Sequence, residues 1–244
     1  MYNKLAIKFL KHIDTTYRTE EEEIMDDFSL EGEELRDALD KIAIINQLLG
    51  GNRLTLKGVK QLLPTNNKEF TIVDVGCGNG DMLRTIADYG KKNNLNFNLI
   101  GIDANAFTIQ HAKQLSSNYE NISYQCLDIF DKVFSEMKYD IVLCTLTLHH
   151  FKNNQIDYLL QLFSKQASLG IVINDLHRNV IAYRLFQLLC FVFQLNKMSR
   201  EDGLISILRG FKKKELESFS KINHLKNYTI HWKWAFRYQW IIRS

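Results

Sequence analysis

The chain has 244 residues, of which 45% are apolar and 24% are charged, and it carries a net charge of +3 at pH 7. This composition excludes a disordered or fibrous chain, and the length suits one α/β domain with an additional helical segment. So small a positive charge gives no strong signal for nucleic acid. The four cysteines lie far apart, no export signal is visible, and the most apolar segment, 180–195, is too short to span a bilayer. We therefore expect a cytoplasmic protein without a transmembrane segment.

The first 66 residues predict an N-terminal helical segment that acts as a lid or cap. Apolar residues recur at helical spacing over 33–49, and Ser29 is placed to cap that helix. Thr55 is placed to cap a second, shorter helix that ends at residue 63. The sequence Pro-Thr-Asn-Asn at 64–67 then indicates a linker.

Residues 67–244 predict a catalytic domain, because strands alternate with helices from residue 70 onward. The expected fold is α/β: a Rossmann-like, seven-stranded, mostly parallel sheet with a helical insertion near 178–221 and a terminal antiparallel hairpin. The expected strands cover 70–75, 97–102, 122–127, 139–144, 170–174, 228–234 and 238–242. The expected helices cover 82–91, 106–115, 154–165, 180–195 and 213–221.

The main functional signal is a glycine-rich turn between an apolar strand and a helix, with glycines at positions 76, 78 and 80. Glycine accepts positive φ, so such a turn can bring backbone donors close to a ligand at the carboxyl end of its strand. The third glycine comes one residue too early for the G-x-G-x-x-G turn of nicotinamide-binding domains. No Gly-Lys-Ser or Gly-Lys-Thr follows to form a phosphate-binding P-loop. We therefore expect neither NAD nor ATP here.

This turn, with Asp74 two places before its first glycine, resembles that of class I S-adenosylmethionine-dependent methyltransferases. The resemblance implies S-adenosylmethionine as cofactor and S-adenosylhomocysteine as product. Asp103 ends the second predicted strand, where it can accept bonds from the ribose hydroxyls, and Asp128 follows the third, where family members bind the adenine amine. Each acid alone would equally suit a helix cap, but the three together favour the cofactor. We expect these cofactor-binding residues: Asp74, Gly76, Cys77, Gly78, Gly80, Asp103, Ala104, Asp128, Ile129 and Thr145. Arg53 is a candidate partner of the cofactor's carboxylate, although a surface position after a helix explains it at least as well.

Residues 140–151 cover the fourth predicted strand and the Thr-Leu-His-His that follows it at 147–150, and they resemble the corresponding motif of methyltransferases of the ubiquinone and menaquinone type. Nucleobase N-methyltransferases commonly carry a Pro-Pro-Tyr-like turn there, and the one proline of this chain is Pro64. Protein arginine methyltransferases use paired glutamates in this region, and residues 139–200 contain none. We therefore expect a small, apolar acceptor, aromatic (a phenol or quinol) or lipid-like, that is methylated on oxygen.

Three histidines are candidate general bases for such an acceptor. His149 and His150 follow the fourth strand, and His177 follows the fifth; His150 and His177 are preferred, although capping or surface roles explain any single histidine as well. Asp175 is placed to orient a histidine or to bind substrate, and a helix cap explains it equally well. Positioning of the reactants is the main demand of in-line methyl transfer, so no metal is expected. The apolar segment 180–195 suits a lid over the acceptor, although core packing or a homodimer interface explains it equally.

Segments 23–27, 33–36, 50–56, 202–203 and 206–209 also resemble a bacterial methyltransferase subgroup associated with phenolic polyketide pathways. Two alternatives remain open. The protein is an RNA or protein methyltransferase if the basic residues near the carboxyl end form a rim with aromatic side chains for stacking. It is a non-catalytic S-adenosylmethionine-binding protein if the fold binds cofactor without turnover. The residues of the basic and aromatic rim are Lys212, Lys213, Lys214, Lys233, Arg237, Trp232, Trp234 and Trp240.

Overall fold

The computed structural model describes residues 13–64 and 69–244, which form one seven-stranded sheet in the order β3-β2-β1-β4-β5-β7-β6. The first five strands pair in parallel, and β7 runs antiparallel to both β5 and β6. The predicted mostly parallel sheet and its terminal antiparallel hairpin are confirmed. The strands are β1 (Glu69–Val75), β2 (Asn96–Asp103), β3 (Ile122–Cys126), β4 (Tyr139–Thr145), β5 (Ala167–Leu176), β6 (Tyr228–Lys233) and β7 (Arg237–Arg243).

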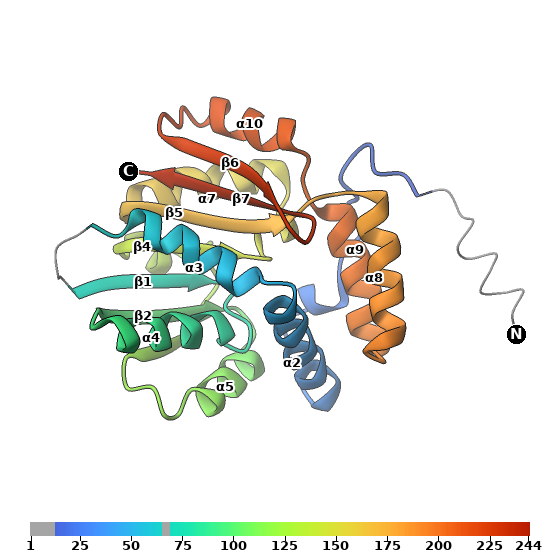
Figure 1. Ribbon diagram of the computed structural model, residues 1–244, viewed down its shortest axis with the longest axis horizontal. Coiled ribbons are helices and arrows are strands. Elements are labelled where there is room, and N and C mark those ends of the chain that lie inside the picture. The colour runs from blue at the N-terminus through green and yellow to red at the C-terminus, as the bar shows by residue number, and fades with distance from the viewer. Residues whose placement is uncertain (1–12, 65–68) are drawn as a thin grey trace, which may run out of the picture.

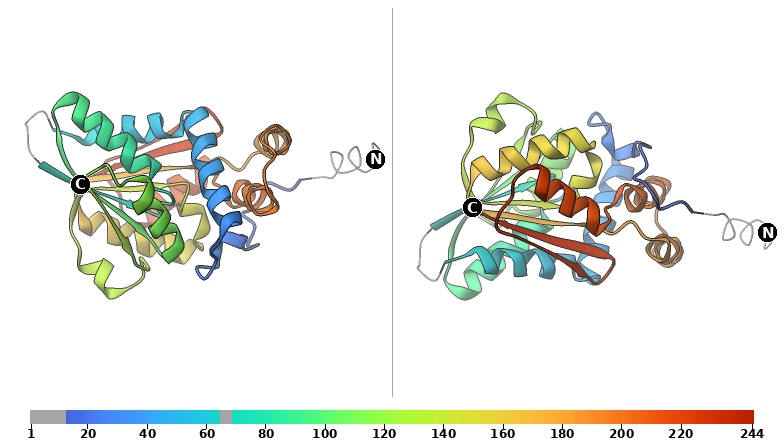
Figure 2. Two further views of the ribbon diagram at one scale, coloured as in Figure 1. Left: turned by 90° about the horizontal axis from the view of Figure 1, so that it is seen from below. Right: turned by 90° about the horizontal axis from the view of Figure 1, so that it is seen from above.

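Helices cover both faces of the sheet (Figures 1 and 2). The two faces pack two separate hydrophobic cores, and the central strands are buried from both sides, which explains their nearly continuous apolar runs. One core includes residues of α3 (Gly51–Leu62), α4 (Asp81–Asn93) and α5 (Ala106–Leu115). The other includes residues of α6 (Lys132–Glu136), α7 (Asn153–Gln166) and α10 (Lys213–Ile222).

A third group of helices lies beyond the carboxyl ends of the parallel strands (Figure 1). It comprises α2 (Glu33–Leu48), α8 (Val180–Val192), α9 (Lys197–Arg209) and the short 3-10 helix η1 (Ile24–Asp26). Helix α9 contacts α8, α2 and η1. Ligands of open α/β sheets bind at this edge, so these helices are placed to enclose a site. None of the described helices is long and apolar enough to cross a membrane.

Both predicted helix caps are wrong, because glycines begin the two helices. Helix α2 follows Gly32 at φ 96°, and the Ser29 hydroxyl instead donates to Asp27. Helix α3 follows Gly50 at φ 80°, so α2 and α3 are joined by a tight left-handed turn. Thr55 therefore lies inside α3, where its hydroxyl contacts the hydroxyl of Thr145 at 3.2 Å.

Helix α3 belongs structurally to the sheet, although it precedes the predicted boundary at residues 66 and 67. Val59 and Leu62 share a core with Val172 of β5, and a Cβ on Gly58 would lie 2.5 Å from Val172 Cγ1. Of the predicted linker at 64–67, only Pro64 is within the described residues. Helix α9 was not predicted, because its apolar residues follow no clear helical stripe and Gly203 interrupts it; that glycine lets α9 pack closely on Phe186 of α8.

Candidate active site

The glycine turn after β1 is held in place by the neighbouring strand. The backbone N–H groups of Gly76 and Cys77 both donate to the carbonyl of Ile102, at 2.8 and 3.0 Å. Gly76, Gly78 and Gly80 all have positive φ, at 68°, 52° and 78°. A Cβ at position 76 or 80 would collide with Thr147 or Tyr124, whereas at Gly78 the nearest atom is Leu39 Cδ2 at 3.9 Å. The space beside Gly78 is therefore open to the cavity that it lines.

Two of the three expected carboxylates, Asp74 and Asp103, lie beside this turn. Asp74 is buried, and its Oδ1 has no hydrogen-bond partner in the described part of the chain. Burial and the nearby Asp81 and Asp103 raise the pKa of Asp74 well above its usual value. Asp103 accepts hydrogen bonds from the backbone of Gly78 at 3.2 Å and of Asn105 at 3.0 Å. An unpaired buried oxygen beside an open glycine turn fits a ligand that brings hydrogen-bond donors, as S-adenosylmethionine does.

These groups line one large cavity of about 1710 Å³ at the carboxyl ends of the strands. Of the predicted cofactor residues, Gly80 and Arg53 are not among its lining residues: Gly80 packs against Tyr124, and Arg53 is exposed on α3. The neighbouring Asn52 is buried instead and donates to Asp81 at 2.8 Å. The lining includes the other nine predicted cofactor residues, Asp74, Gly76, Cys77, Gly78, Asp103, Ala104, Asp128, Ile129 and Thr145, and the histidines His149, His150 and His177.

The second 3-10 helix, η2 (Leu148–His150), follows β4 closely and carries the first two histidines. The His149 side chain is only 2% exposed, and its Nδ1 lies 2.7 Å from Asp175 Oδ1. Burial alone would raise the pKa of Asp175, but the contact with His149 holds it below its usual value. The carboxylate is thus ionised, so His149 Nδ1 carries the proton and donates it. Asp175 orients a histidine, as predicted.

His150 is oriented by a different carboxylate. Its Nδ1 lies 2.6 Å from Oδ1 of Asp26, and Oδ2 of Asp26 accepts from Arg209 Nη1 at 2.5 Å. Burial would raise the pKa of Asp26, but His150 and Arg209 keep it well below its usual range. His150 therefore donates from Nδ1, which leaves Nε2 as the ring's basic atom. In the described residues Nε2 has no hydrogen-bond partner, and the half-buried ring lines the cavity.

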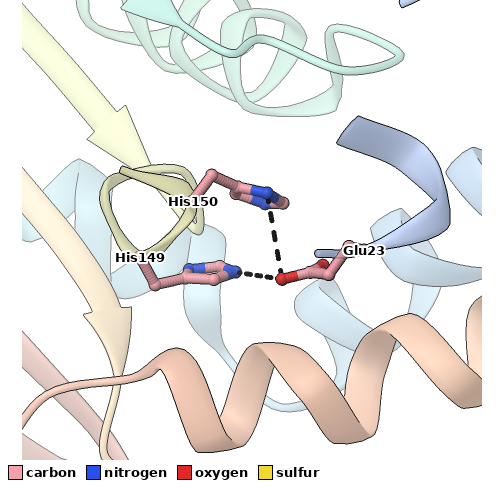
Figure 3. A group of neighbouring side chains, drawn as sticks. All are labelled: Glu23, His149 and His150. Carbon is pink, nitrogen blue, oxygen red and sulfur yellow. Dashed lines mark ion pairs between the residues drawn. The ribbon is translucent and has the colours of Figure 1, made fainter. Parts of the chain in front are cut away.

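Glu23 lies beside both imidazoles (Figure 3). Its Oε1 is 3.6 Å from His149 Nε2 and 3.8 Å from His150 Nδ1, and burial raises the pKa of Glu23 to about 7. Ligand atoms of the three residues lie within 4.8 Å of one another, a spacing that a metal ion spans. His150 Nδ1 is already bonded to Asp26, however, and the Arg209 guanidinium lies 3.6 Å from the same Glu23 oxygen. These contacts favour protonation of Glu23 over binding of a divalent cation by the three residues.

His177 lies apart from this pair. Its Nδ1 accepts a hydrogen bond from the Trp232 indole at 3.2 Å, and its ring packs edge-on against Tyr238 with centroids 5.0 Å apart. Burial, with Lys212 and Arg178, lowers the pKa of His177 to about 4. The described chain gives it no carboxylate to orient or charge it, so His177 is less suited than His150 to act as a base.

Residues 15–27 form a strap that closes the site from the amino-terminal side. Arg18 donates to the carbonyls of His149 at 2.8 Å and Phe151 at 2.9 Å. Asp202 of α9 accepts from the backbone N–H groups of Ile24 and Met25 at 2.7 and 2.9 Å. The strap thereby fixes η1, which carries Asp26, against η2. The sequence alone indicated no role for Glu23, Asp26 or Arg209; the one signal that touched them was the family resemblance of 23–27, 202–203 and 206–209.

The predicted basic and aromatic rim is not formed as expected. Trp240 is fully buried in the sheet, and Arg237 is buried at the start of β7. Trp232 and Trp234 are exposed. Two of the eight residues of the predicted rim are therefore unable to stack on or attract a nucleic acid or protein at the surface, because Trp240 belongs to the core and Arg237 lines the cavity.

The sheet order, the glycine turn and the three strand-end carboxylates are together those of a class I S-adenosylmethionine-dependent methyltransferase.

Comparisons with known proteins agree with this class. A family model described as a methyltransferase domain matches residues 66–229. The chain is 33% identical over 98 residues to "Putative methyltransferase 235L" of Invertebrate iridescent virus 6, which covers 40% of this chain and 33% of that protein. The plantazolicin methyltransferase BpumL in complex with S-adenosylhomocysteine is similar with a TM-score of 0.63 and 20% identity, over 84% of this chain and 89% of that one. Magnesium protoporphyrin IX methyltransferase from Synechocystis PCC 6803 has a TM-score of 0.52 and 14% identity, over 90% and 89%.

The chain therefore belongs to the methyltransferase domain family, and its cofactor is S-adenosylmethionine. The likeness to the solved structures is below 25% identity, so it supports the fold and not a particular acceptor.

Proposed function

We propose that the protein transfers a methyl group from S-adenosylmethionine to a hydroxyl of a small aromatic acceptor, with His150 as general base. The observation that carries this proposal is the Asp26–His150 pair, in which the carboxylate holds the proton on Nδ1 and leaves Nε2 basic at the cavity. A phenol with a pKa of about 10 loses its proton more readily to such a base during attack. His149 is too enclosed for this role and supports His150 through ring contact at 4.3 Å.

The cofactor would lie along the glycine turn. Asp103 would accept hydrogen bonds from the ribose hydroxyls, and Asp128 would accept one from the adenine amine. Asp74 and Thr145 would face the amino-acid end of the cofactor. When bound there, S-adenosylmethionine supplies an activated methyl group. The protein's contribution is to hold the acceptor oxygen in line with that group and to accept its proton at His150 Nε2.

Helix α8 would cover the part of the cavity that binds the acceptor. This helix presents Leu185, Phe186 and Leu189 to the cavity, and Trp234 and Phe236 line it from the β6–β7 hairpin. An apolar, aromatic lining suits a ring-containing acceptor and excludes water. Two fold neighbours are methyltransferases named for plantazolicin and for magnesium protoporphyrin IX. The size of this cavity, about 1710 Å³, leaves room for cofactor and acceptor together.

Transfer of a labelled methyl group tests the proposal. The protein is incubated with methyl-labelled S-adenosylmethionine and a panel of phenols and quinols, each paired with its fully methylated ether as a control that lacks any free hydroxyl. We expect label in the hydroxyl-bearing members alone. Transfer to carbon in the ether controls would overturn O-methylation, and binding of cofactor without transfer to any acceptor would favour the non-catalytic alternative. Salt-sensitive RNA binding would favour an RNA substrate.

A further inference from the structure

Within residues 13–64 and 69–244 three arginines are buried, and two of them are fully paired. Arg178 donates to Glu215 at 2.6 Å and to the carbonyls of Thr15 and Thr16. Arg209 donates to Asp26 and to the carbonyls that end η2. These contacts are what burial of a guanidinium requires, because each N–H group removed from water needs an acceptor.

Arg237 has no such partners. Arg237 is only 3% exposed. Its Nε and Nη1 atoms are buried and have no hydrogen-bond acceptor in the described part of the chain. The charge that acts on it is that of Asp175, whose oxygens are already engaged by His149 and by the backbone of Leu176. Burial lowers the pKa of Arg237 to about 10, so the guanidinium is still charged at neutral pH. A charge so placed is costly unless an anion reaches it.

The position of Arg237 gives an anion access. It is the first residue of β7 and lines the large cavity. Nε and Nη1 are the enclosed, unpaired atoms of its guanidinium, and Nη2 is not one of them. Nη1 lies close to the start of α3, since a Cβ on Gly51 would be 2.9 Å from it. Asn46, on the same side, has an unpaired, enclosed Oδ1 and also lines the cavity. Polar groups without partners thus gather at one point of the cavity wall.

We propose that Arg237 binds a carboxylate of a molecule that enters this cavity. A guanidinium offers a planar pair of donors that matches a carboxylate. No second cation is among the charges that act on Arg237, so the site suits a single negative charge better than a phosphate. The carboxylate has two sources: the amino-acid end of the cofactor, for which sequence reasoning had chosen the exposed Arg53, or an acid group on the acceptor. If the carboxylate belongs to the acceptor, this inference rests on the proposed function; if it belongs to the cofactor, it does not.

The first test needs no ligand. Arg237→Met keeps much of the side-chain volume and removes the unpaired charge, and Arg243→Met makes the same change at an exposed position of the same strand. We expect the ligand-free Arg237→Met protein to melt at a higher temperature than wild type, whereas Arg243→Met should leave the melting temperature unchanged. A lower melting temperature for Arg237→Met would show that the guanidinium has a structural partner and would overturn the proposal.

The second test identifies the source by equilibrium binding. One arm compares S-adenosylhomocysteine with 5′-methylthioadenosine, which lacks the amino-acid carboxylate; the other compares a hydroxybenzoate with the corresponding hydroxybenzamide. We expect Arg237→Met to weaken the carboxylate-bearing member of one pair by about tenfold or more and to leave its partner unchanged. A loss in the first arm assigns the cofactor, and a loss in the second assigns an acidic acceptor. Equal effects within both pairs, or no effect, would overturn the proposal. Methyl transfer is measured separately, so failure of the proposed function leaves this result intact.

Discussion

The two ends of the cavity are built in different ways. The proposed cofactor end comes from one strand–turn–helix unit and from acids at or just beyond the ends of their own strands, so each group is placed by local structure. The acceptor end is assembled from distant segments: Asp26 from the strap, His150 from η2, Asp175 from β5 and Arg209 from α9. Changes at the first end should therefore alter cofactor affinity, and changes at the second should alter turnover alone.

The largest expected effect is on turnover, at the acceptor end. His150→Ala should lower kcat by about 100- to 10,000-fold, the usual contribution of a general base, with little change in the affinity for S-adenosylhomocysteine. Asp26→Asn should lower kcat by at least about tenfold, because the amide no longer holds the Nδ1 proton in place. His177→Ala is the matched histidine control, and steady-state rates across pH measure all three. If His177→Ala lowers kcat more than His150→Ala and Asp26→Asn do, the assignment of His150 as the base is contradicted.

A change at the cofactor end should show the opposite pattern. Gly78→Val forces a side chain into a positive-φ position that faces the cavity, and we expect it to weaken S-adenosylhomocysteine binding by about ten- to a hundredfold. Gly32→Val imposes similar backbone strain outside the cavity lining, at φ 96° with no atom within 4 Å of its Cβ. Calorimetric titration of both variants separates the two effects. Equal loss of affinity in Gly32→Val would attribute the result to general destabilisation.

The sequence located three carboxylates that line the cavity but missed the partners of His150, for one physical reason. Asp74, Asp103 and Asp128 lie at or just beyond the ends of their own strands, so alternating strands and helices suffice to locate them. The contact of Asp26 with His150 joins residues 124 positions apart and depends on the strap packing against α9. The helix caps failed in the same way: Ser29 and Thr55 have the right chemistry, but left-handed glycines start the helices and the hydroxyls bond elsewhere.

Glu23 should make the stability of the acceptor end depend on pH. Burial raises its pKa from 4.5 to about 7, so its contribution to stability is present below pH 4.5 and is lost as pH rises through about 7. Glu23→Gln removes this titration, and the wild type should therefore lose stability relative to the variant between pH 5 and 8, by an amount on the order of 3 kcal/mol. Chemical denaturation at several pH values measures the difference. Glu21→Gln, at an exposed position nearby, should track the wild type, and a constant gap for Glu23→Gln would contradict the assignment.

The smallest expected effect concerns Arg53, which the sequence made a candidate partner of the cofactor's carboxylate. Because its side chain is exposed and absent from the cavity lining, Arg53→Ala should change S-adenosylhomocysteine affinity by less than about twofold. Binding measured at low and moderate salt checks this expectation. A tenfold loss would return Arg53 to the cofactor site and would mean that α3 moves when the cofactor binds.

The central claim is that the glycine turn and its three carboxylates form the cofactor site, and direct binding of S-adenosylhomocysteine tests it. We predict that the wild-type protein binds it with micromolar affinity or better and is stabilised against heat, and that Asp103→Ala weakens binding by about tenfold or more through loss of the ribose contacts. Absence of binding in the wild type, or equal binding by Asp103→Ala, would contradict the account.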